Sequence, residues 1–289
     1  MSITDLRTSH GQAISTGFLL ITDWIESGSC MQEVKSSIQN RSLAPETIRV
    51  ATYNIHKCKG IDGRTSAARI VDVIKEINPD IIALQEVLSH TANSCEKHQA
   101  LYLAERLEMH IVKGPNIFFE GGEYGNVVLS RFPVSFHRNF SLSWRRREPR
   151  GCLRADVSLG SVTVHVFNAH LGTSYLERCC QVRELFEKTI VTDPELSKAK
   201  ILLGDFNDWF RGRPSRILRA ELHEVPIRRR LIRQRTFPGL LPVFHLDRIY
   251  LGAALRAHHA YVHKSKLARV ASDHLPVVAE LEIDGVSSM

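Results

Sequence analysis

The stretch Ile201-Leu202-Leu203-Gly204-Asp205-Phe206-Asn207 joins an apolar run directly to a polar cluster. About seventy residues later, Ser272-Asp273-His274 stands directly before the apolar run Leu275-Pro276-Val277-Val278. Apolar runs of this length, bounded by turn-forming residues, predict buried β-strands. α/β enzymes place their chemistry at the ends of such strands. Two carboxylates, an amide and an imidazole meeting there predict a site for a hard metal ion and a phosphate group.

Further fragments have the same character, each an apolar run attached to polar residues. They are Asn54-Ile55-His56 after residues 50–53, Gln85-Glu86 after residues 81–84, Asn168-Ala169-His170 after residues 162–167, and Asp247 within the apolar run 246–251. The pattern therefore predicts one site assembled from the ends of several strands.

In chain order these fragments are N-x-H, Q-E, N-A-H, G-D-F-N, L-D-R-I-Y and S-D-H. The set and its order resemble the endonuclease/exonuclease/phosphatase superfamily, the DNase I-like group that also contains abasic-site endonucleases, neutral sphingomyelinases and inositol-polyphosphate 5-phosphatases. Residues 48 to 283 carry the resemblance, and the segment G-N-V-V-L-S-R-F-P is most similar to uncharacterised bacterial members. The resemblance implies a four-layer α/β sandwich, with two mixed β-sheets packed face to face and helices flanking them.

Local patterns agree with an α/β fold of short strands and few helices. Thr65-Ser66 caps an expected helix that ends before Pro79, and Ser174 can cap another that runs to about residue 189. Further helices are expected over 96–107 and from Pro214 to 220. Expected strands after residue 85 are 127–129, 152–157, 162–167, 200–203, 247–251, 259–263 and 276–283, with a hairpin through Gly160-Ser161. The domain is expected over 47–284, between an extension, 1–46, and a tail, 285–289.

Hydrolysis of a phosphodiester needs a nucleophile in line with the leaving group and neutralisation of charge on the phosphoryl oxygens. Mg²⁺ suits the second task and prefers carboxylate and amide oxygens. Glu86 is the expected primary metal ligand, because an unpaired carboxylate ending an apolar strand would be costly. Asn54 would assist as an oxygen ligand or orient Glu86. Asp273 is the expected third ligand, with a capping role as its alternative.

The resemblance implies the catalytic groups. Asp205 would position and deprotonate the attacking water, and Asn207 would donate its amide to a phosphoryl oxygen. Asp247 is similar to the family residue that pairs with His274, which would bind a phosphoryl oxygen in its protonated form. His170 resembles the second histidine of the DNase I and sphingomyelinase branches, a general acid or leaving-group stabiliser unless it is structural.

Weaker candidates for substrate contact are Asn126, Arg150 and Arg235. Two features depart from abasic-site endonucleases, which have N-x-D where this chain has Asn54-Ile55-His56, and a tyrosine motif where it has Asn168-Ala169-His170. Both departures argue against a role on abasic DNA.

Bulk composition fits one sizeable α/β domain, with 43% hydrophobic residues in 289. The net charge of +7 is concentrated in two clusters, Arg145–Arg147 with Arg150 and Arg154, and Arg228–Arg230 with Arg233 and Arg235. They indicate solvated faces or an anionic partner, either nucleic acid or an acidic membrane surface. No run approaches the length of a transmembrane span.

The six cysteines have no repeating spacing, which favours reduced thiols in a cytoplasmic protein, peripheral to a membrane if the basic clusters bind one; a secreted, disulfide-bonded protein is the alternative.

The leading hypothesis is a Mg²⁺-dependent phosphodiesterase, with Mn²⁺ as a substitute, that uses an activated water. Its substrate would be a phospholipid or a nucleic acid. A phosphomonoesterase acting on a small polyphosphate would differ only in pocket shape. A non-catalytic binding module on the same fold is the third hypothesis, and such a chain would have lost one or more of the acids retained here.

Overall fold

The computed structural model describes residues 45–90, 98–188, 190–229 and 232–284, which belong to one compact unit. The expected extension 1–46, apart from its last two residues, and the expected tail 285–289 lie outside the described residues. Within the described part no helix has the length and apolarity needed to cross a bilayer.

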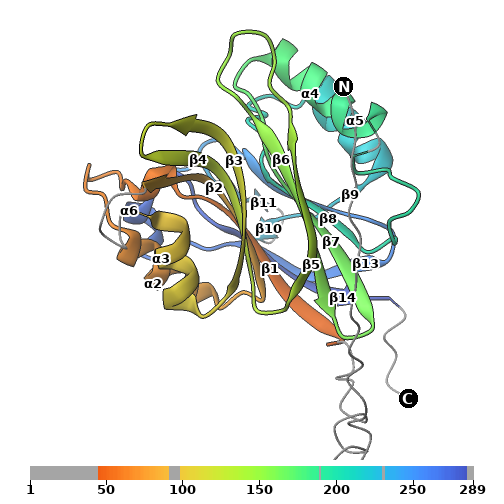
Figure 1. Ribbon diagram of the computed structural model, residues 1–289, viewed down its shortest axis with the longest axis horizontal. Helices are drawn as coiled ribbons and strands as arrows, with labels where there is room; N and C mark the ends of the chain where they lie inside the picture. The colour runs from red at the N-terminus through yellow and green to blue at the C-terminus, as the bar shows by residue number, and fades with distance from the viewer. Residues whose placement is uncertain (1–44, 91–97, 189, 230–231, 285–289) are drawn as a thin grey trace, which may run out of the picture. The chain divides into compact units, whose positions relative to one another are not determined.

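Two mixed sheets, each of six strands in the described chain, pack face to face (Figure 1). The first has the order β13-β14-β1-β2-β4-β3, and its strands are β1 (Thr47–Asn54), β2 (Ile81–His90), β3 (His110–Phe119), β4 (Gly122–Ser130), β13 (Leu255–Val262) and β14 (Val277–Ile283). The second has the order β5-β6-β7-β8-β12-β9, and its strands are β5 (Val134–Ser141), β6 (Gly151–Leu159), β7 (Val162–His170), β8 (Lys200–Asp205), β9 (His223–Glu224) and β12 (Asp247–Leu251).

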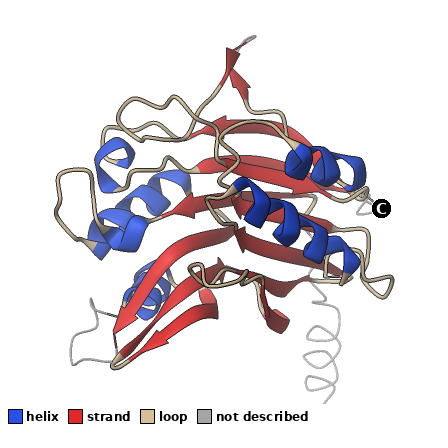
Figure 2. Ribbon diagram, turned by 90° about the horizontal axis from the view of Figure 1, so that it is seen from above, coloured by secondary structure: helices blue, strands red, loops and turns tan. Residues whose placement is uncertain are grey.

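Helices cover the outer faces of the two sheets. α2 (Ala67–Ile77) and α3 (Gln99–Leu107) lie on the side of the first sheet, and α4 (Tyr175–Glu187) and α5 (Arg213–Glu221) on the side of the second (Figure 1). Figure 2 shows helices in front of and beside the strands in a second view. The fold is therefore the predicted four-layer α/β sandwich. Smaller elements are η1 (His56–Cys58), α6 (Ala268–Ala271) and the pair β10 (Arg228–Arg229) and β11 (Ile232–Arg233).

Helix α2 shows how local sequence sets an element. Ser66 caps it, since its Oγ accepts a hydrogen bond from the backbone N–H of Arg69 at 3.4 Å. Ile70, Ile74 and Ile77 recur at helical spacing and are buried. Burial of each such side chain stabilises the fold by roughly 1.5–3 kcal/mol. Asn78 ends the helix in the left-handed conformation, φ 53°.

Two apolar clusters hold the layers together. The larger combines side chains of both sheets with those of α2 and α3. The smaller lies beneath α4 and α5, where Phe167, Leu202 and Tyr250 pack with Val182 and Leu185. Buried strands on both faces explain why residues 81–84 and 201–203 are continuous apolar runs rather than alternating ones.

Candidate active site

The polar fragments of the sequence meet at one edge of the two sheets. β1 and β2 run parallel with Asn54 opposite Gln85, and β7 and β8 run parallel with His170 opposite Asp205. Asp247 begins β12 directly opposite Asp205. Strand direction and register therefore bring the ends of strands from both sheets to the same place, as the sequence predicts.

The Asn54 amide joins the two sheets. Its Nδ2 donates to Glu86 Oε1 at 3.1 Å and to Asp205 Oδ2 at 3.1 Å. Its Oδ1 accepts a hydrogen bond from the His56 backbone N–H at 3.1 Å, which fixes the orientation of the amide. Of the two roles expected for Asn54, this geometry matches the orientation of Glu86, because the amide presents hydrogen rather than oxygen to the carboxylates.

His274 and Asp247 form a buried pair. His274 Nδ1 lies 2.9 Å from Asp247 Oδ2, and His274 Nε2 lies 3.6 Å from Asp205 Oδ2. Burial alone would lower the pKa of His274, but the carboxylates of Asp247 and Asp205 outweigh it and raise the pKa to about 10. The imidazole is therefore a cation at neutral pH, with Nδ1–H donating to Asp247 and Nε2–H directed toward Asp205.

Asp205 is a buried carboxylate, with 1% of its surface exposed. Burial raises its pKa to about 6, the Asp247 charge adds to the rise, and the His274 charge opposes it. Its Oδ1 accepts a hydrogen bond from the backbone N–H of Asn207 at 2.9 Å. A carboxylate with this pKa can accept a proton near neutral pH far more readily than an ordinary aspartate.

His170 has the opposite charge state to His274. Arg150 Nη1 lies 2.9 Å from its Nδ1 and 3.2 Å from its Nε2, and a guanidinium can only donate, so this contact favours an imidazole with one unprotonated nitrogen. Burial, the Arg150 charge and the His274 charge hold the pKa of His170 well below its usual range. His170 is therefore neutral here, which favours the leaving-group stabiliser or the structural role over that of a general acid. All three roles stay predictions.

Asn207 departs from its expected geometry. The sequence predicts an extended segment with Asp205 and Asn207 on one side, but Asn207 has φ 47°. Its Nδ2 donates to the Leu171 carbonyl at 2.8 Å and lies 3.4 Å from His170 Nε2. The side chain thus orients His170 and its loop in this structure.

Backbone strain gathers around the same residues. Glu86 has φ 57°, at the point where the pairing register of β2 and β4 shifts, and His56, Lys57 and Cys58 have φ of 45°, 57° and 57° in succession. Such conformations cost of order 1 kcal/mol or more for residues with a Cβ, and they persist where the surroundings fix them, often at functional sites. The bulge turns the Glu86 side chain out of the apolar register of its strand.

The donor chemistry of the site fits a hard divalent cation. In the described chain, the residues whose ligand atoms all lie within 4.8 Å of one another are Asp205, Asp247 and His274. This group shares no residue with the predicted ligand set of Glu86, Asn54 and Asp273. Glu86 and Asp273 are oxygen donors of the type that Mg²⁺ prefers, and the Asp273 side chain is 32% exposed beside His56.

The weaker candidates lie in three different settings. Arg150 is buried within the site, between His170 and Glu148. Asn126 is buried, and both Nδ2 hydrogens are used, on the carbonyls of Gly151 and Asn168, so none remains for a phosphate. Arg235 is exposed.

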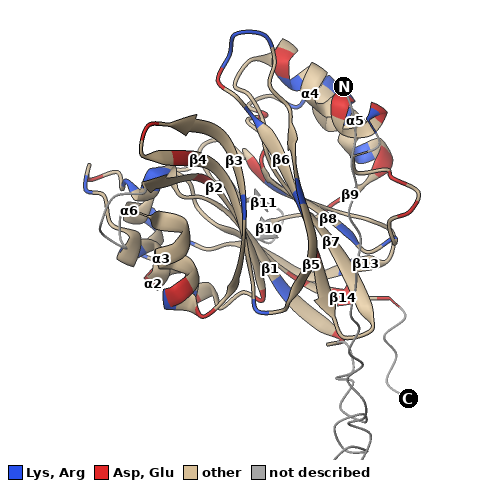
Figure 3. Cartoon of the chain, viewed as in Figure 1, with Lys and Arg blue, Asp and Glu red and all other residues tan. Residues whose placement is uncertain are grey.

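The described part of the chain includes the first of the two predicted basic clusters. Arg154 is paired with Asp156 at 2.6 Å. The basic residues 145–147 lie on the loop between β5 and β6, coloured blue in Figure 3. The side chains of residues 228–233 lie outside the described part.

Three further residues support the site although they are not among the site residues predicted from the sequence. Thr236 Oγ1 accepts from the backbone N–H groups of Leu246 and Asp247 at 3.2 and 3.4 Å. Ser272 Oγ donates to the Asn54 carbonyl at 2.8 Å. The buried Tyr124 hydroxyl hydrogen-bonds Glu86, and burial raises its pKa. Ser272 is the first residue of the S-D-H motif and could have been found from the sequence. The contacts of Thr236 and Tyr124 could not.

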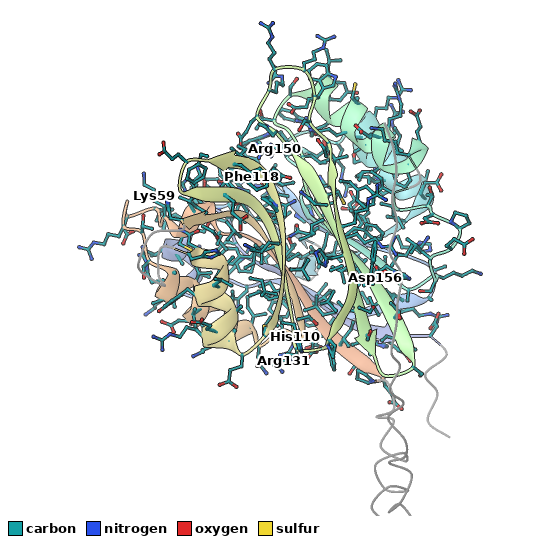
Figure 4. All side chains as sticks on the ribbon, viewed as in Figure 1. Lys59, His110, Phe118, Arg131, Arg150 and Asp156 are labelled. Atoms are coloured by element: carbon teal, nitrogen blue, oxygen red, sulfur yellow. The ribbon has the colours of Figure 1, made fainter. Side chains whose placement is uncertain are left out.

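A cavity of about 500 Å³ lies away from these residues, at the start of β1. Its lining charges are paired, Arg49 with Glu280 at 2.8 Å and Arg131 with Asp80 at 3.6 Å. Figure 4 shows Arg131 and His110 at the opposite end of the sandwich from Arg150 and Phe118. The chemistry therefore concentrates at the Arg150 end and not at this cavity.

A model of the Endonuclease/Exonuclease/phosphatase family matches residues 51–274. The chain belongs to this family. Among curated relatives, an uncharacterised protein, YbhP, of Escherichia coli strain K12 is 30% identical over 249 residues, which cover 82% of this chain and 97% of YbhP. The matching YbhP of Shigella flexneri has the same identity and coverage.

Solved structures of the endonuclease/exonuclease/phosphatase family show the same fold. A member from Beutenbergia cavernae has a TM-score of 0.63 at 24% identity, covering 84% of this chain and 73% of that one. TDP2 from Caenorhabditis elegans has a TM-score of 0.61 at 18% identity, over 89% and 82% of the two chains. A mannosyl-6-phosphatase from Bacteroides thetaiotaomicron has a TM-score of 0.63 at 20% identity, over 81% and 99%.

Proposed function

We propose that this protein hydrolyses phosphodiesters with a metal-activated and Asp205-activated water, in a reaction that requires Mg²⁺ or, as a substitute, Mn²⁺. The observation that carries the proposal is the position of Asp205. Its Oδ2 lies 3.6 Å from His274 Nε2 and 3.1 Å from Asn54 Nδ2, and its pKa is raised to about 6. A base and a fixed cation side by side suit the attack of water on an anionic phosphorus centre.

Each of the site residues named here has its own task in the proposed mechanism. Asp205 accepts the proton of the attacking water. Protonated His274, held by Asp247, donates Nε2–H to a phosphoryl oxygen, where negative charge grows in the transition state. Arg150 adds a second fixed positive charge beside neutral His170. Asn54 and Tyr124 hold the Glu86 carboxylate in place.

Glu86 and Asp273 are the residues proposed to hold the metal ion, with Asn54 orienting the former. A bound divalent cation would neutralise phosphoryl charge and stabilise the departing oxygen. This assignment is supported by the oxygen-donor chemistry of the two carboxylates and by the strained backbone that directs Glu86 toward Asn54.

The proposed location is the cytoplasm. Cys58, Cys152, Cys179 and Cys180 are all free thiols among the described residues. Free thiols in this number are typical of a reducing compartment.

The decisive experiment uses bis-p-nitrophenyl phosphate, a soluble diester. Wild type is expected to hydrolyse it with Mg²⁺ or Mn²⁺, to stop with EDTA, and to recover when metal is added back. Asp205→Asn and His274→Gln are each expected to lower kcat by on the order of 100-fold or more. Robust turnover in EDTA, or by Asp205→Asn, would overturn the mechanism.

A matched control exists within the same chain. His165 and Asp156 form a second buried pair, with Nδ1 2.8 Å from Oδ1, but outside the site. His165→Gln is therefore expected to lower stability while kcat of the folded enzyme stays near wild type. Equal kcat losses in His165→Gln and His274→Gln would assign His274 a structural role.

The phosphomonoesterase alternative is supported by one neighbour, the mannosyl-6-phosphatase from Bacteroides thetaiotaomicron. p-Nitrophenyl phosphate, a monoester, separates the two in the same assay. A higher kcat/KM on the monoester would favour this alternative, and no turnover of either ester would favour the binding module.

A further inference from the structure

Two loops beside the candidate active site expose large apolar side chains to solvent. Phe210 follows the G-D-F-N segment and is 79% exposed. Leu240, Leu241 and Val243, in the loop before β12, are 61%, 74% and 43% exposed. These four side chains are called the apolar rim below. Clusters of exposed apolar side chains mark interaction surfaces more often than isolated ones do.

The apolar rim rests on a packed aromatic base. The Trp209 ring lies edge-on to Phe237 at 5.5 Å and to Phe244 at 4.8 Å between centroids. Phe237 and Phe244 also form an antiparallel β-bridge that closes the 237–244 loop. The Phe210 ring contacts Phe244 with centroids 6.5 Å apart. The four exposed side chains are thus presented by two loops that pack on each other.

The same base contacts the catalytic groups. The Phe237 ring centroid lies 4.9 Å from that of His274, and the Gly239 N–H donates to the Asp273 carbonyl at 2.6 Å. Thr236, next in the chain, supports Asp247. A molecule that covers the apolar rim therefore lies next to His274, where the phosphoryl group of the substrate is proposed to bind. A ligand that fits both places has an apolar group joined to a phosphate.

Two observations favour lipid over nucleic acid. Bases stack on aromatic rings, but three of the four rim side chains are aliphatic, the kind that inserts between lipid chains. Basic residues flank the rim: Arg213 lies three residues after Phe210, and Arg269 Nη1 donates to the Leu240 carbonyl at 3.0 Å. The side chain of Arg211, next to Phe210, is 43% exposed and pairs with Glu224 at 3.2 Å. Arginines around an apolar surface complement the anionic headgroups of a bilayer.

We propose that the apolar rim inserts into anionic phospholipid bilayers and that the substrate is a phospholipid, whose phosphodiester enters the site while its acyl chains remain in the membrane. This inference rests on the proposed phosphodiesterase function and specifies its substrate class. The rim supplies the apolar contact, and the adjacent arginines supply attraction to the surface.

The test uses the full-length protein and unilamellar vesicles of phosphatidylcholine, with or without 30 mol% phosphatidylglycerol, in a flotation assay. Wild type is expected to bind the anionic vesicles at least tenfold more tightly than the neutral ones. Leu240→Ser/Leu241→Ser is expected to weaken that binding at least tenfold and to slow phosphatidylglycerol hydrolysis to match. Its turnover of soluble bis-p-nitrophenyl phosphate should stay within twofold of wild type.

The control variant is Leu101→Ser/Phe136→Ser, which changes two apolar side chains that are 41% and 46% exposed on α3 and β5. It is expected to bind vesicles like wild type. If both double variants bind anionic vesicles like wild type, while soluble diester is still hydrolysed, the lipid inference is wrong and the proposed function stands. If wild type does not hydrolyse soluble bis-p-nitrophenyl phosphate, the proposed function itself is wrong.

Two other results would also overturn the lipid inference. Duplex DNA binding or cleavage that falls in Leu240→Ser/Leu241→Ser, with vesicle binding unchanged, would make the rim a nucleic-acid surface. A wild-type dimer that becomes monomeric in this variant, measured by light scattering, would make it an interface between copies of this chain.

Discussion

At the scale of single residues, the site separates two buried histidines into opposite charge states. His274 faces the carboxylates of Asp247 and Asp205, and its pKa rises to about 10. Burial and the facing Arg150 guanidinium both lower the pKa of His170. Both are almost fully buried, so the neighbouring charges and not solvent exposure decide the difference. One imidazole can then bind an anion while the other accepts a hydrogen bond.

The raised pKa of His274 predicts a dependence of stability on pH in the metal-free protein. The folded pKa of about 10 lies above the ordinary 6.5, so this pair stabilises the fold fully below pH 6.5. That stability is lost as the pH rises toward 10, and each pH unit in this window removes at most about 1.4 kcal/mol. Urea unfolding at pH 7, 8, 9 and 10 in EDTA should show the free energy of unfolding falling by about 2 kcal/mol or more.

Asp247→Asn is expected to be less stable at pH 7 and to lose less stability between pH 7 and 10 than wild type, since the neutral amide no longer favours the imidazolium. His259→Asn, at an exposed position, should keep the wild-type slope. The raised pKa of Asp205, about 6, changes stability at lower pH, from about pH 4 to 6. It therefore does not affect the comparison of slopes between pH 7 and 10. Identical slopes for Asp247→Asn and wild type would contradict the assignment.

Thr236 is predicted to position Asp247. Thr236→Val leaves the backbone N–H groups of Leu246 and Asp247 without their acceptor, so the strand start should shift. We expect kcat on bis-p-nitrophenyl phosphate to fall roughly 10- to 100-fold with little change in KM, because small displacements of catalytic groups have effects of this size. Thr236→Ser keeps the hydroxyl and should restore kcat; a Ser variant as slow as Val would exclude this role.

The residues that could be predicted from sequence are those attached to apolar runs. Asn54, Glu86, Asp205 and His274 stand at the ends of such runs, and the topology brings them together. Positions set by long-range contacts could not be predicted. Tyr124 reaches Glu86 only because β4 pairs with β2, and nothing in its local sequence indicates that contact.

At the scale of elements, the close approach of β7 and β8 depends on Gly204. Its φ is 146°, and a Cβ placed on it would lie 1.8 Å from the Ala169 carbonyl oxygen in β7. Gly204→Ala is expected to destabilise the protein by roughly 3 kcal/mol or more, from the clash and the unfavourable φ. Gly63→Ala adds a Cβ with nothing within 4 Å at φ 77°, and should cost only about 1–2 kcal/mol. Thermal and urea unfolding of both variants would check the difference; equal losses would mean that β7 can move.

Elements with strong local signals can be predicted from the sequence, and edge elements cannot. The helix α2 and the hairpin of β6 and β7 follow from capping, spacing and Gly160. β3 and β5 are absent from the expected strands because neither has a continuous buried apolar run. In β3 buried, intermediate and exposed residues are mixed, and Val134–Ser141 lies almost wholly at the surface. β13 begins at Leu255 rather than near 259, since its start is set by pairing with Ile283. Ser174 precedes α4 but forms no side-chain cap.

At the scale of the whole sandwich, catalysis depends on how the sheets face each other, because the first sheet carries Asn54 and Glu86 and the second carries His170, Asp205 and Asp247. No sequence pattern specifies this relation between the sheets. A buried amide network fixes it. Asn168, on β7, donates to the carbonyls of Leu84 and Val127 at 2.9 Å each, and accepts from Gln85 Nε2 at 2.8 Å.

Through these hydrogen bonds Asn168 is predicted to hold the two halves of the site in their relative positions. Asn168→Leu removes three buried hydrogen bonds between the sheets, to the Leu84 and Val127 carbonyls and from Gln85 Nε2, which should lower the free energy of unfolding by roughly 3–5 kcal/mol. Asn139→Leu removes a comparable bond between the sheets, from Nδ2 to the Pro115 carbonyl at 2.8 Å, but at an exposed position where water can replace it. It should therefore cost less than about 1 kcal/mol.

If the sheets also shift, folded Asn168→Leu will have a lower kcat on bis-p-nitrophenyl phosphate while Asn139→Leu keeps the wild-type value. Unfolding curves measure the stabilising effect of Asn168. Initial rates, measured at a temperature where both variants are folded, show whether Asn168 also aligns the catalytic residues of the two sheets.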